Sequence, residues 1–477
     1  MVAVTGAAAR RVAGPERAAV VYRTVWRWHF YAGVVALPFI IWMAITGSIY
    51  LFRPQVEAVL DRKYDHLGLG GPRASPSAQL AAALAVVPGG VLNAYQLPES
   101  PDAATQILVG RGPQLIRVYV NPVTLRVLGQ IPDDDRLMRR IFHLHGELLM
   151  GDRGSMVVET VASWAVVMLL TGLFLWWPRN ARGPAGVLYP RLSRGGRVVW
   201  RDLHAVTGMW VSGYALFLLL SGLPWAKSWG GMLKEVRGLG HHATTAQDWT
   251  TGRSSELAQR QAMNDQGAGD GAHAGHAHLA MSAAASTLDY GTLDRIVPVV
   301  APLRIAPPVL ISPPSRMTSR WTARSDAANR SLRSDLVLDG ATGAVVGRTD
   351  FAQKPWLDRM IGYGISVHEG QFFGWPNRAL GVLTAIGLLL MMVSAARLWW
   401  SRREAGTLGA PLAMAGWRPG ALLIALMVAM AIVLPLWGLT VVLVLLLERL
   451  VLRRWAPAIR VLGLESAVAR RPAPFTS

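Results

Sequence analysis

Trp28-His29-Phe30-Tyr31-Ala32-Gly33 opens the first long apolar segment of the chain, which closes on Thr46-Gly47. A second apolar segment opens with Leu203-His204-Ala205-Val206-Thr207-Gly208 and closes on Ser221-Gly222. In both segments the first glycine follows the histidine by four residues, and the last glycine follows it by 18. This agreement between two long apolar runs predicts two copies of one membrane-spanning unit.

Another pair of apolar segments carries a different repeated pattern. Six residues separate His145 from Gly151 and His368 from Gly374, and a Trp-Trp pair follows each histidine by 31 residues. The predicted fold is therefore a mainly α-helical multi-pass membrane protein with a duplicated four-helix transmembrane core. Each half consists of a span, an outer domain and a second span, and a C-terminal helical hairpin follows the second half.

Composition supports a membrane protein and narrows its chemistry. Of the 477 residues, 52% are hydrophobic and only 16% are charged, and the mean hydropathy is +0.30. The formal net charge of +19 comes largely from arginines beside the apolar runs, where they anchor helices to anionic lipid, so nucleic-acid binding is not expected. The absence of cysteine excludes disulfides, thiolate zinc sites, iron–sulfur clusters and covalently attached c-type haem.

Six apolar segments are predicted to cross about 30 Å of hydrocarbon. They cover 25–52, 155–177, 201–225, 376–400, 417–434 and 436–453, and the last two form a hairpin that turns at Pro435. Arginines cluster in or beside 1–24, 178–200, 401–416 and 454–477. The excess of positive charge predicts that these segments, with both termini, are cytoplasmic and that the protein lies in a bacterial inner membrane. The first span is too long for a signal peptide.

Two long segments, 53–150 and 226–375, are then periplasmic. Each contains a helical pattern followed by short alternating runs typical of β-strands, and each closes on a strand, tight turn and strand, at 121–129 and 339–347. Each segment is therefore expected to form an α+β module. Residues 239–285 are rich in Gly, Ala, Gln and His without periodicity and are interpreted as a disordered insert.

Four histidines are the main candidate site residues. His29 and His204 lie near the cytoplasmic ends of their spans, whereas His145 and His368 precede spans at the outer surface. One histidine from each half at each level predicts two sites, one near each face of the membrane. A single histidine at a span end more often contacts a headgroup or another helix, but four at matched positions favour metal ligands. Two imidazoles saturate haem iron, which favours electron transfer over oxygen binding.

Neighbouring residues refine this interpretation. Gly33 and Gly208 share a helix face with the preceding histidine and leave room for a flat macrocycle. His143 is an alternative ligand to His145, although its counterpart in the second half is Ser366. The Thr-Gly and Ser-Gly pairs are interpreted as contacts that allow close helix packing.

The insert contains a different histidine pattern. His273, His276 and His278 occur in Gly-Ala-His-Ala-Gly-His-Ala-His, which resembles a flexible trap for Cu or Zn. The sequence leaves two interpretations open, a weak metal site and a neutral low-complexity insert.

With these residues the chain resembles the PepSY-associated transmembrane-helix family, which includes iron-regulated membrane proteins and siderophore-iron reductases of the bacterial inner membrane. The resemblance covers about 22–403 and rests on Trp28-His29, Leu144-His145, Asp202-Leu203-His204 and His368-Glu369-Gly370, together with two hairpins similar to PepSY modules. For the reductase members it implies b-type haem, an outer ferric substrate and a role in iron acquisition, and the two histidine pairs predict two haems. Asn121-Pro122 departs from the usual Asp and Gly of the hairpin, and the insert and the C-terminal hairpin are additions, so the substrate stays open.

The predicted function is a dihaem electron-transfer protein that reduces a periplasmic ferric siderophore or another oxidised metal. The electron donor is expected to be a quinol or another protein, because the sequence has no G-x-G-x-x-G motif after a strand and no soluble domain large enough for a nicotinamide or flavin fold. Two alternatives stay open. One is a haem-free transporter or accessory permease for iron or a siderophore, and the other is a PepSY-type regulatory or scaffold protein.

Overall fold

The computed structural model describes residues 14–112, 114–179, 183–238, 289–314, 320–411 and 420–464, and the chain divides into two compact units. Unit 1 contains Met1–Ala44, Val157–Leu220 and Thr384–Ser477, which include most of the long apolar helices. Unit 2 contains Ile45–Met156 and Ser221–Leu383, which include the described strands and the short helices around them.

Long apolar helices dominate the described chain. Five of them are long and apolar enough to cross a membrane, and they lie in α1 (Gly14–Tyr50), α5 (Gly151–Trp176), α6 (Gly196–Gly222), α12 (Trp375–Trp400) and α14 (Pro435–Leu450). A helix suits such sequences because it satisfies every backbone polar group internally where lipid offers no partner. The expectation of a mainly helical membrane protein is confirmed, and the described chain also contains a β-sheet domain.

The C-terminal part of unit 1 forms a helical hairpin. α13 (Ala421–Val433) stops just before Pro435, which begins α14 because proline cannot continue a preceding helix. A Cβ on Gly438 would lie 2.7 Å from Cβ of Ala431, so the two helices meet closely beyond the turn. The 13 residues of α13 extend about 20 Å, less than about 30 Å of hydrocarbon, so the sixth crossing predicted over 417–434 is not among the five candidate spans.

Unit 2 is built on one sheet of eight antiparallel strands in the order β4-β3-β2-β1-β5-β6-β7-β8. The strands are β1 (Val91–Gln96), β2 (Thr105–Arg111), β3 (Gln114–Val120), β4 (Val127–Pro132), β5 (Val309–Ser312), β6 (Trp321–Ser325), β7 (Ser334–Leu338) and β8 (Val345–Asp350). The two outer segments thus contribute four strands each to a shared sheet. β1 and β5 join the two sets of four strands, with Tyr95 opposite Ile311. This pairing satisfies backbone N–H and C=O groups of two strands that would otherwise be exposed edges.

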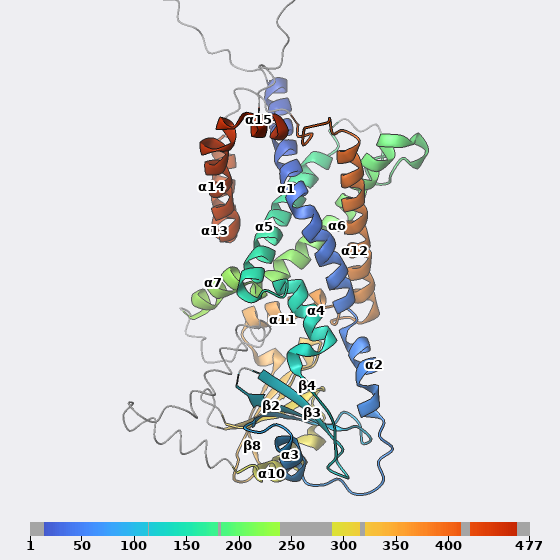
Figure 1. Cartoon of the computed structure of the whole chain (residues 1–477), viewed down its shortest axis with the longest axis vertical. Helices are drawn as coiled ribbons and strands as arrows, with labels where there is room; N and C mark the ends of the chain where they lie inside the picture. The colour runs from blue at the N-terminus through green and yellow to red at the C-terminus, as the bar shows by residue number, and fades with distance from the viewer. Residues whose placement is uncertain are drawn as a thin grey trace, which may run out of the picture. The chain divides into compact units, whose positions relative to one another are not determined.

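Two helices, α3 (Pro76–Ala85) and α10 (Thr292–Val300), cover one face of the sheet (Figure 1). Alternate strand residues face them, and Ile107, Val118 and Ile311 are buried against Leu80 of α3 and Ile296 of α10. Each such side chain stabilises the fold by roughly 1.5–3 kcal/mol relative to exposure. A single apolar core therefore combines residues from both outer segments.

Two short helices lead into long ones. α4 (Leu137–Glu147) precedes α5, and α11 (Trp356–His368) precedes α12. The chain turns between them at Gly151 and Gly374, whose φ angles of +59° and +70° disfavour residues with a Cβ. His145 and His368 therefore lie at the ends of α4 and α11 nearest these turns. The remaining helices used below are α2 (Arg53–Asp65), α15 (Ala456–Leu462) and the 3-10 helix η1 (Asp133–Asp135).

Candidate functional site

The first histidine pair lies in unit 1. His29 of α1 and His204 of α6 face each other with ring centroids 6.3 Å apart and ring planes at 77°. Two metal–nitrogen bonds of about 2 Å on opposite sides of one metal ion also separate imidazole centroids by about 6 Å. The structure thus brings together the two histidines that the sequence predicts as the inner pair, at a spacing that fits a shared metal ion.

Hydrogen bonds fix the tautomer of both inner imidazoles. Nδ1 of His204 lies 3.1 Å from the carbonyl oxygen of Met391, which can only accept, so Nδ1 donates the proton. Nδ1 of His29 lies 3.1 Å from Oγ1 of Thr171, whose hydroxyl already donates to backbone carbonyls of α5, so here too Nδ1 donates. On both rings the lone pair is then on Nε2, the nitrogen that would bind a metal.

Three glycines lie around the inner pair, and the sequence did not indicate which side chains contact them. A Cβ on Gly172 would lie 3.2 Å from Cε1 of His29, a tight contact, so the glycine gives the ring room to lie against α5. Gly33 and Gly208 face methionines, since their Cβ atoms would lie 3.9 Å from Sδ of Met168 and 3.2 Å from Cε of Met391. That these two glycines pack against a haem stays a prediction.

The second histidine pair lies in unit 2. Nδ1 of His145 is 2.9 Å from Oγ1 of Thr46, and Nδ1 of His368 is 2.9 Å from Oγ of Ser221. Burial, followed by the proximity of His368, lowers the pKa of His145 to about 3. The His145 imidazole is therefore neutral at physiological pH, which is the form that binds metal ions.

The outer pair repeats the glycine contact of the inner one. A Cβ on Gly47 would lie 3.2 Å from Cε1 of His145, and a Cβ on Gly222 would lie 3.4 Å from Cε1 of His368. The interpretation of Thr46-Gly47 as a helix-packing contact was therefore incomplete, because the hydroxyl orients an imidazole and the glycine makes room for it. The signal in the sequence was the equal spacing of a hydroxyl-Gly pair from both span histidines.

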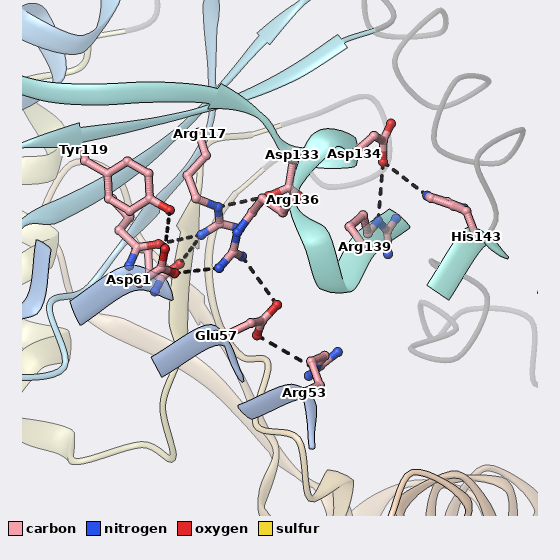
Figure 2. Close-up of polar contacts among 12 residues, drawn as sticks. Arg53, Glu57, Asp61, Arg117, Tyr119, Asp133, Asp134, Arg136, Arg139 and His143 are labelled. Carbon is pink, nitrogen blue, oxygen red and sulfur yellow. Dashed lines mark hydrogen bonds and ion pairs between the residues drawn. The ribbon is translucent and has the colours of Figure 1, made fainter. Parts of the chain in front are cut away.

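A buried ionic network fastens α4, which carries His145, to α2 (Figure 2). Arg136, the N-cap residue of α4, contacts Asp61 at 2.6 Å and Glu57 at 3.8 Å, two residues one turn apart on α2. On the neighbouring η1, Asp133 accepts two hydrogen bonds from Arg117 of β3, at 2.8 and 2.9 Å. Both the sheet and α2 therefore hold the start of α4 in place.

His143 belongs to this network rather than to the outer pair. Its Nε2 lies 3.3 Å from Asp134 (Figure 2). Its Nδ1 lies 3.2 Å from Glu147, so both ring nitrogens contact carboxylates. Burial lowers the pKa of His143, but the hydrogen bonds that the ring donates to Asp134 and Glu147 outweigh this effect and raise the pKa overall. This placement favours His145 over His143 as the residue that faces His368.

We expect loss of the Arg136 contact to destabilise unit 2. Arg136→Gln leaves Asp61 without its cation, while Glu57 keeps its contact with Arg53, and at 17% side-chain exposure the cost should be about 2 kcal/mol, between the values for surface and fully buried pairs. Thermal unfolding of the purified protein in detergent measures it. Arg140→Gln is the matched control, because Arg140 also pairs with an aspartate but is 61% exposed, and equal losses in both variants would contradict the role given to Arg136.

One comparison with known proteins identifies the family. The family model of the PepSY-associated TM region matches residues 26–402. The chain belongs to the PepSY-associated transmembrane family. No curated protein matches it. In this PepSY-associated protein the matched residues include both histidine pairs and both halves of the sheet, whereas α13 and α14 lie beyond the match.

The loop histidines of this PepSY-associated protein are not placed. His273, His276 and His278 lie outside the described residues, so a weak Cu or Zn site there stays a prediction. Within the described ranges, no group of three or more His, Cys, Asp or Glu side chains is arranged to hold a metal ion.

Proposed function

We propose that this protein is a b-type dihaem electron-transfer protein that reduces a ferric siderophore, or another oxidised metal, outside a bacterial inner membrane. One observation carries the proposal: Nδ1 of each of the four histidines is held by a hydroxyl or carbonyl oxygen. Proteins orient metal-binding imidazoles in this way, with Nε2 directed to the metal. Four imidazoles oriented in two pairs are what two six-coordinate haems require.

The chain's own residues have separate roles in this proposal. His29 and His204 would hold one haem and His145 and His368 the other, and bound haem supplies an iron that exchanges single electrons. Thr46, Ser221 and Thr171 fix the orientation of three of the rings. The apolar helices exclude water from the inner pair, and an iron held by two imidazoles would have no position left for oxygen.

An internal duplication is part of the same proposal. Met168 and Met391 lie beside equivalent glycines, and Thr46-Gly47 and Ser221-Gly222 lie against equivalent histidines. The strand order β4-β3-β2-β1 on one side of the β1–β5 contact is matched by β5-β6-β7-β8 on the other. These correspondences support two copies of one unit, each with a PepSY-like α+β module and two spans.

The direction of electron flow follows from the arginines. Arginines beside the N-terminal end of α1 and the C-terminal end of α12 predict that these ends are cytoplasmic, so the sheet of unit 2 is periplasmic. Electrons from a quinol or a donor protein would reach the inner pair first and the ferric substrate last. Reduction releases the metal because hard oxygen donors hold Fe(III) far better than Fe(II).

An absorbance spectrum of the purified full chain tests the proposal. The dithionite-reduced protein should show the α-band of b-type haem with about two haems per chain, and an added ferric siderophore should reoxidise it. A colourless preparation with intact helical circular dichroism would reject the proposal. That result would leave the haem-free transporter or permease and the PepSY-type scaffold as the remaining candidates.

A further inference from the structure

The hairpin beyond the family match enters the membrane region and returns to the side from which it came. At the far end of α14, the chain continues through α15 to Gly463, whose carbonyl accepts a hydrogen bond of 2.8 Å from Arg27 near the start of α1. The same guanidinium donates to the carbonyl of Pro411, which precedes the hairpin, at 2.7 Å. Both ends of the hairpin are therefore tied to one end of α1.

The contact with α5 sets the depth of the turn. Trp437 packs against Trp164, which lies midway along the 26 residues of α5, so the turn at Leu434-Pro435 lies inside about 30 Å of hydrocarbon rather than at the opposite surface. Trp437, in the first turn of α14, is at this depth. Its side chain is only 5% exposed.

Trp437 carries a polar atom with no partner at this depth. Its ring contacts Trp164 of α5 with centroids 5.9 Å apart, and Nε1 of Trp164 donates to Oγ1 of Thr440 at 3.0 Å. The Thr440 hydroxyl donates in turn to backbone carbonyls of α14. Nε1 of Trp437 is left without a hydrogen-bond partner among the described residues. A buried indole N–H without an acceptor costs about 1–3 kcal/mol, and hydrocarbon contains no water to satisfy it.

The unsatisfied donor is close to the inner histidine pair. Trp164 packs with Met168, one turn along α5, in a cluster that also contains Ala32 and Ala36 of α1. Met168 lies beside Gly33, one turn from His29. A chain of direct contacts within unit 1 therefore leads from Trp437 to the helix that carries an inner imidazole.

We propose that the indole N–H of Trp437 donates a hydrogen bond to the carbonyl oxygen of a membrane quinone. Ester carbonyls of phospholipids lie at the surface of the bilayer, whereas a quinone carries its carbonyls into the hydrocarbon. The inference rests on the proposed function, since it names the donor as a quinol rather than a protein. Because Nε1 is enclosed, the head group must enter between the hairpin and α5, with movement of the hairpin turn.

The redox step is balanced by the two proposed irons. One quinol would lose two electrons and two protons as it becomes the quinone. Each of the two histidine pairs would hold an iron that accepts one electron, and the protons would leave to water at the membrane surface. Trp437 takes no part in this exchange. It holds the ring by one oxygen and is a binding residue.

The test compares Trp437→Phe with the unaltered full chain in nanodiscs. Phenylalanine keeps the aromatic packing against Trp164 and removes only the N–H. We expect binding of a short-chain ubiquinone analogue, measured calorimetrically on the oxidised protein, to weaken about tenfold, which is about 1.4 kcal/mol. Haem reduction by the corresponding quinol should slow by a similar factor, while haem content and reduction by dithionite stay unchanged.

The control is Trp455→Phe, because Trp455 follows the same hairpin but is 58% exposed, and it should leave binding unchanged. Equal quinone affinity in the Trp437→Phe and unaltered proteins would overturn the quinone site even if both contain two haems. A colourless chain that still binds the quinone through Trp437 would retain this site and reject the dihaem function. Unchanged thermal unfolding of Trp437→Phe excludes misfolding as the cause of weaker binding.

Discussion

Replacing His204 by alanine is expected to lower the haem content from about two per chain to about one. The substitution removes one axial ligand of the inner pair and leaves His29 facing an empty space across the 6.3 Å centroid separation. One imidazole cannot saturate the iron, so the inner haem should be lost on purification. The reduced pyridine haemochrome, divided by protein concentration, measures the ratio, and reduction of a ferric siderophore by an added electron donor should stop.

The outer pair provides the internal comparison for this variant. His145 and His368 with their hydroxyl partners belong to unit 2, so the remaining haem should keep its spectrum and its redox potential. His66→Ala is the matched control, because His66 is an exposed histidine outside both pairs. Two haems in the His204→Ala protein would show that the ligands are wrongly assigned.

Gly172→Val should remove the same haem although it replaces no predicted ligand. The Cβ alone would lie 3.2 Å from Cε1 of His29, and the two γ-carbons of valine would enter the space of the ring. His29 would then lose its hydrogen bond to Thr171 and turn away from His204. We expect about one haem per chain, measured as for His204→Ala.

Gly213→Val is the control for the general effect of replacing a glycine by valine in a long apolar helix. Gly213 lies on α6, another long apolar helix of unit 1, and a Cβ there meets no atom within 4 Å. The control should keep both haems and unfold at an unchanged temperature. If Gly172→Val also kept both haems, the close contact between the glycine and the imidazole would have no bearing on the proposed cofactor.

The pairing of the histidines in the candidate site could be predicted because their spacing from nearby glycines repeats in the sequence. The matched offsets of His29 and His204 from their glycines predicted that these side chains would meet, and their rings do meet. The contact of His204 with the carbonyl of Met391 could not be predicted, because it joins residues far apart in the chain. Every residue has a backbone carbonyl that can accept a hydrogen bond, so the identity of the accepting residue leaves no motif in the sequence.

The outer segments show a similar limit. Alternating runs and the turns within 121–129 and 339–347 predicted strands in both outer segments, and the structure has four described strands in each. Pairing of β1 with β5, which merges two expected modules into one sheet, was not predictable, because any exposed strand edge can pair with another of suitable length. The hairpin turn at Pro435 was predicted from the residue itself, but the depth of the turn depended on the contact of Trp437 with Trp164.

By itself the sequence determined that this is a helical membrane protein with repeated histidines and no thiol chemistry, since hydropathy, spacing and composition are local properties of the chain. Only the tertiary structure decided which oxygen orients each imidazole, that His143 pairs with carboxylates, and that Trp437 has an unsatisfied N–H. These features depend on distances of a few ångströms between residues of different helices. Packing of the helices sets such distances, and no one-dimensional pattern records them.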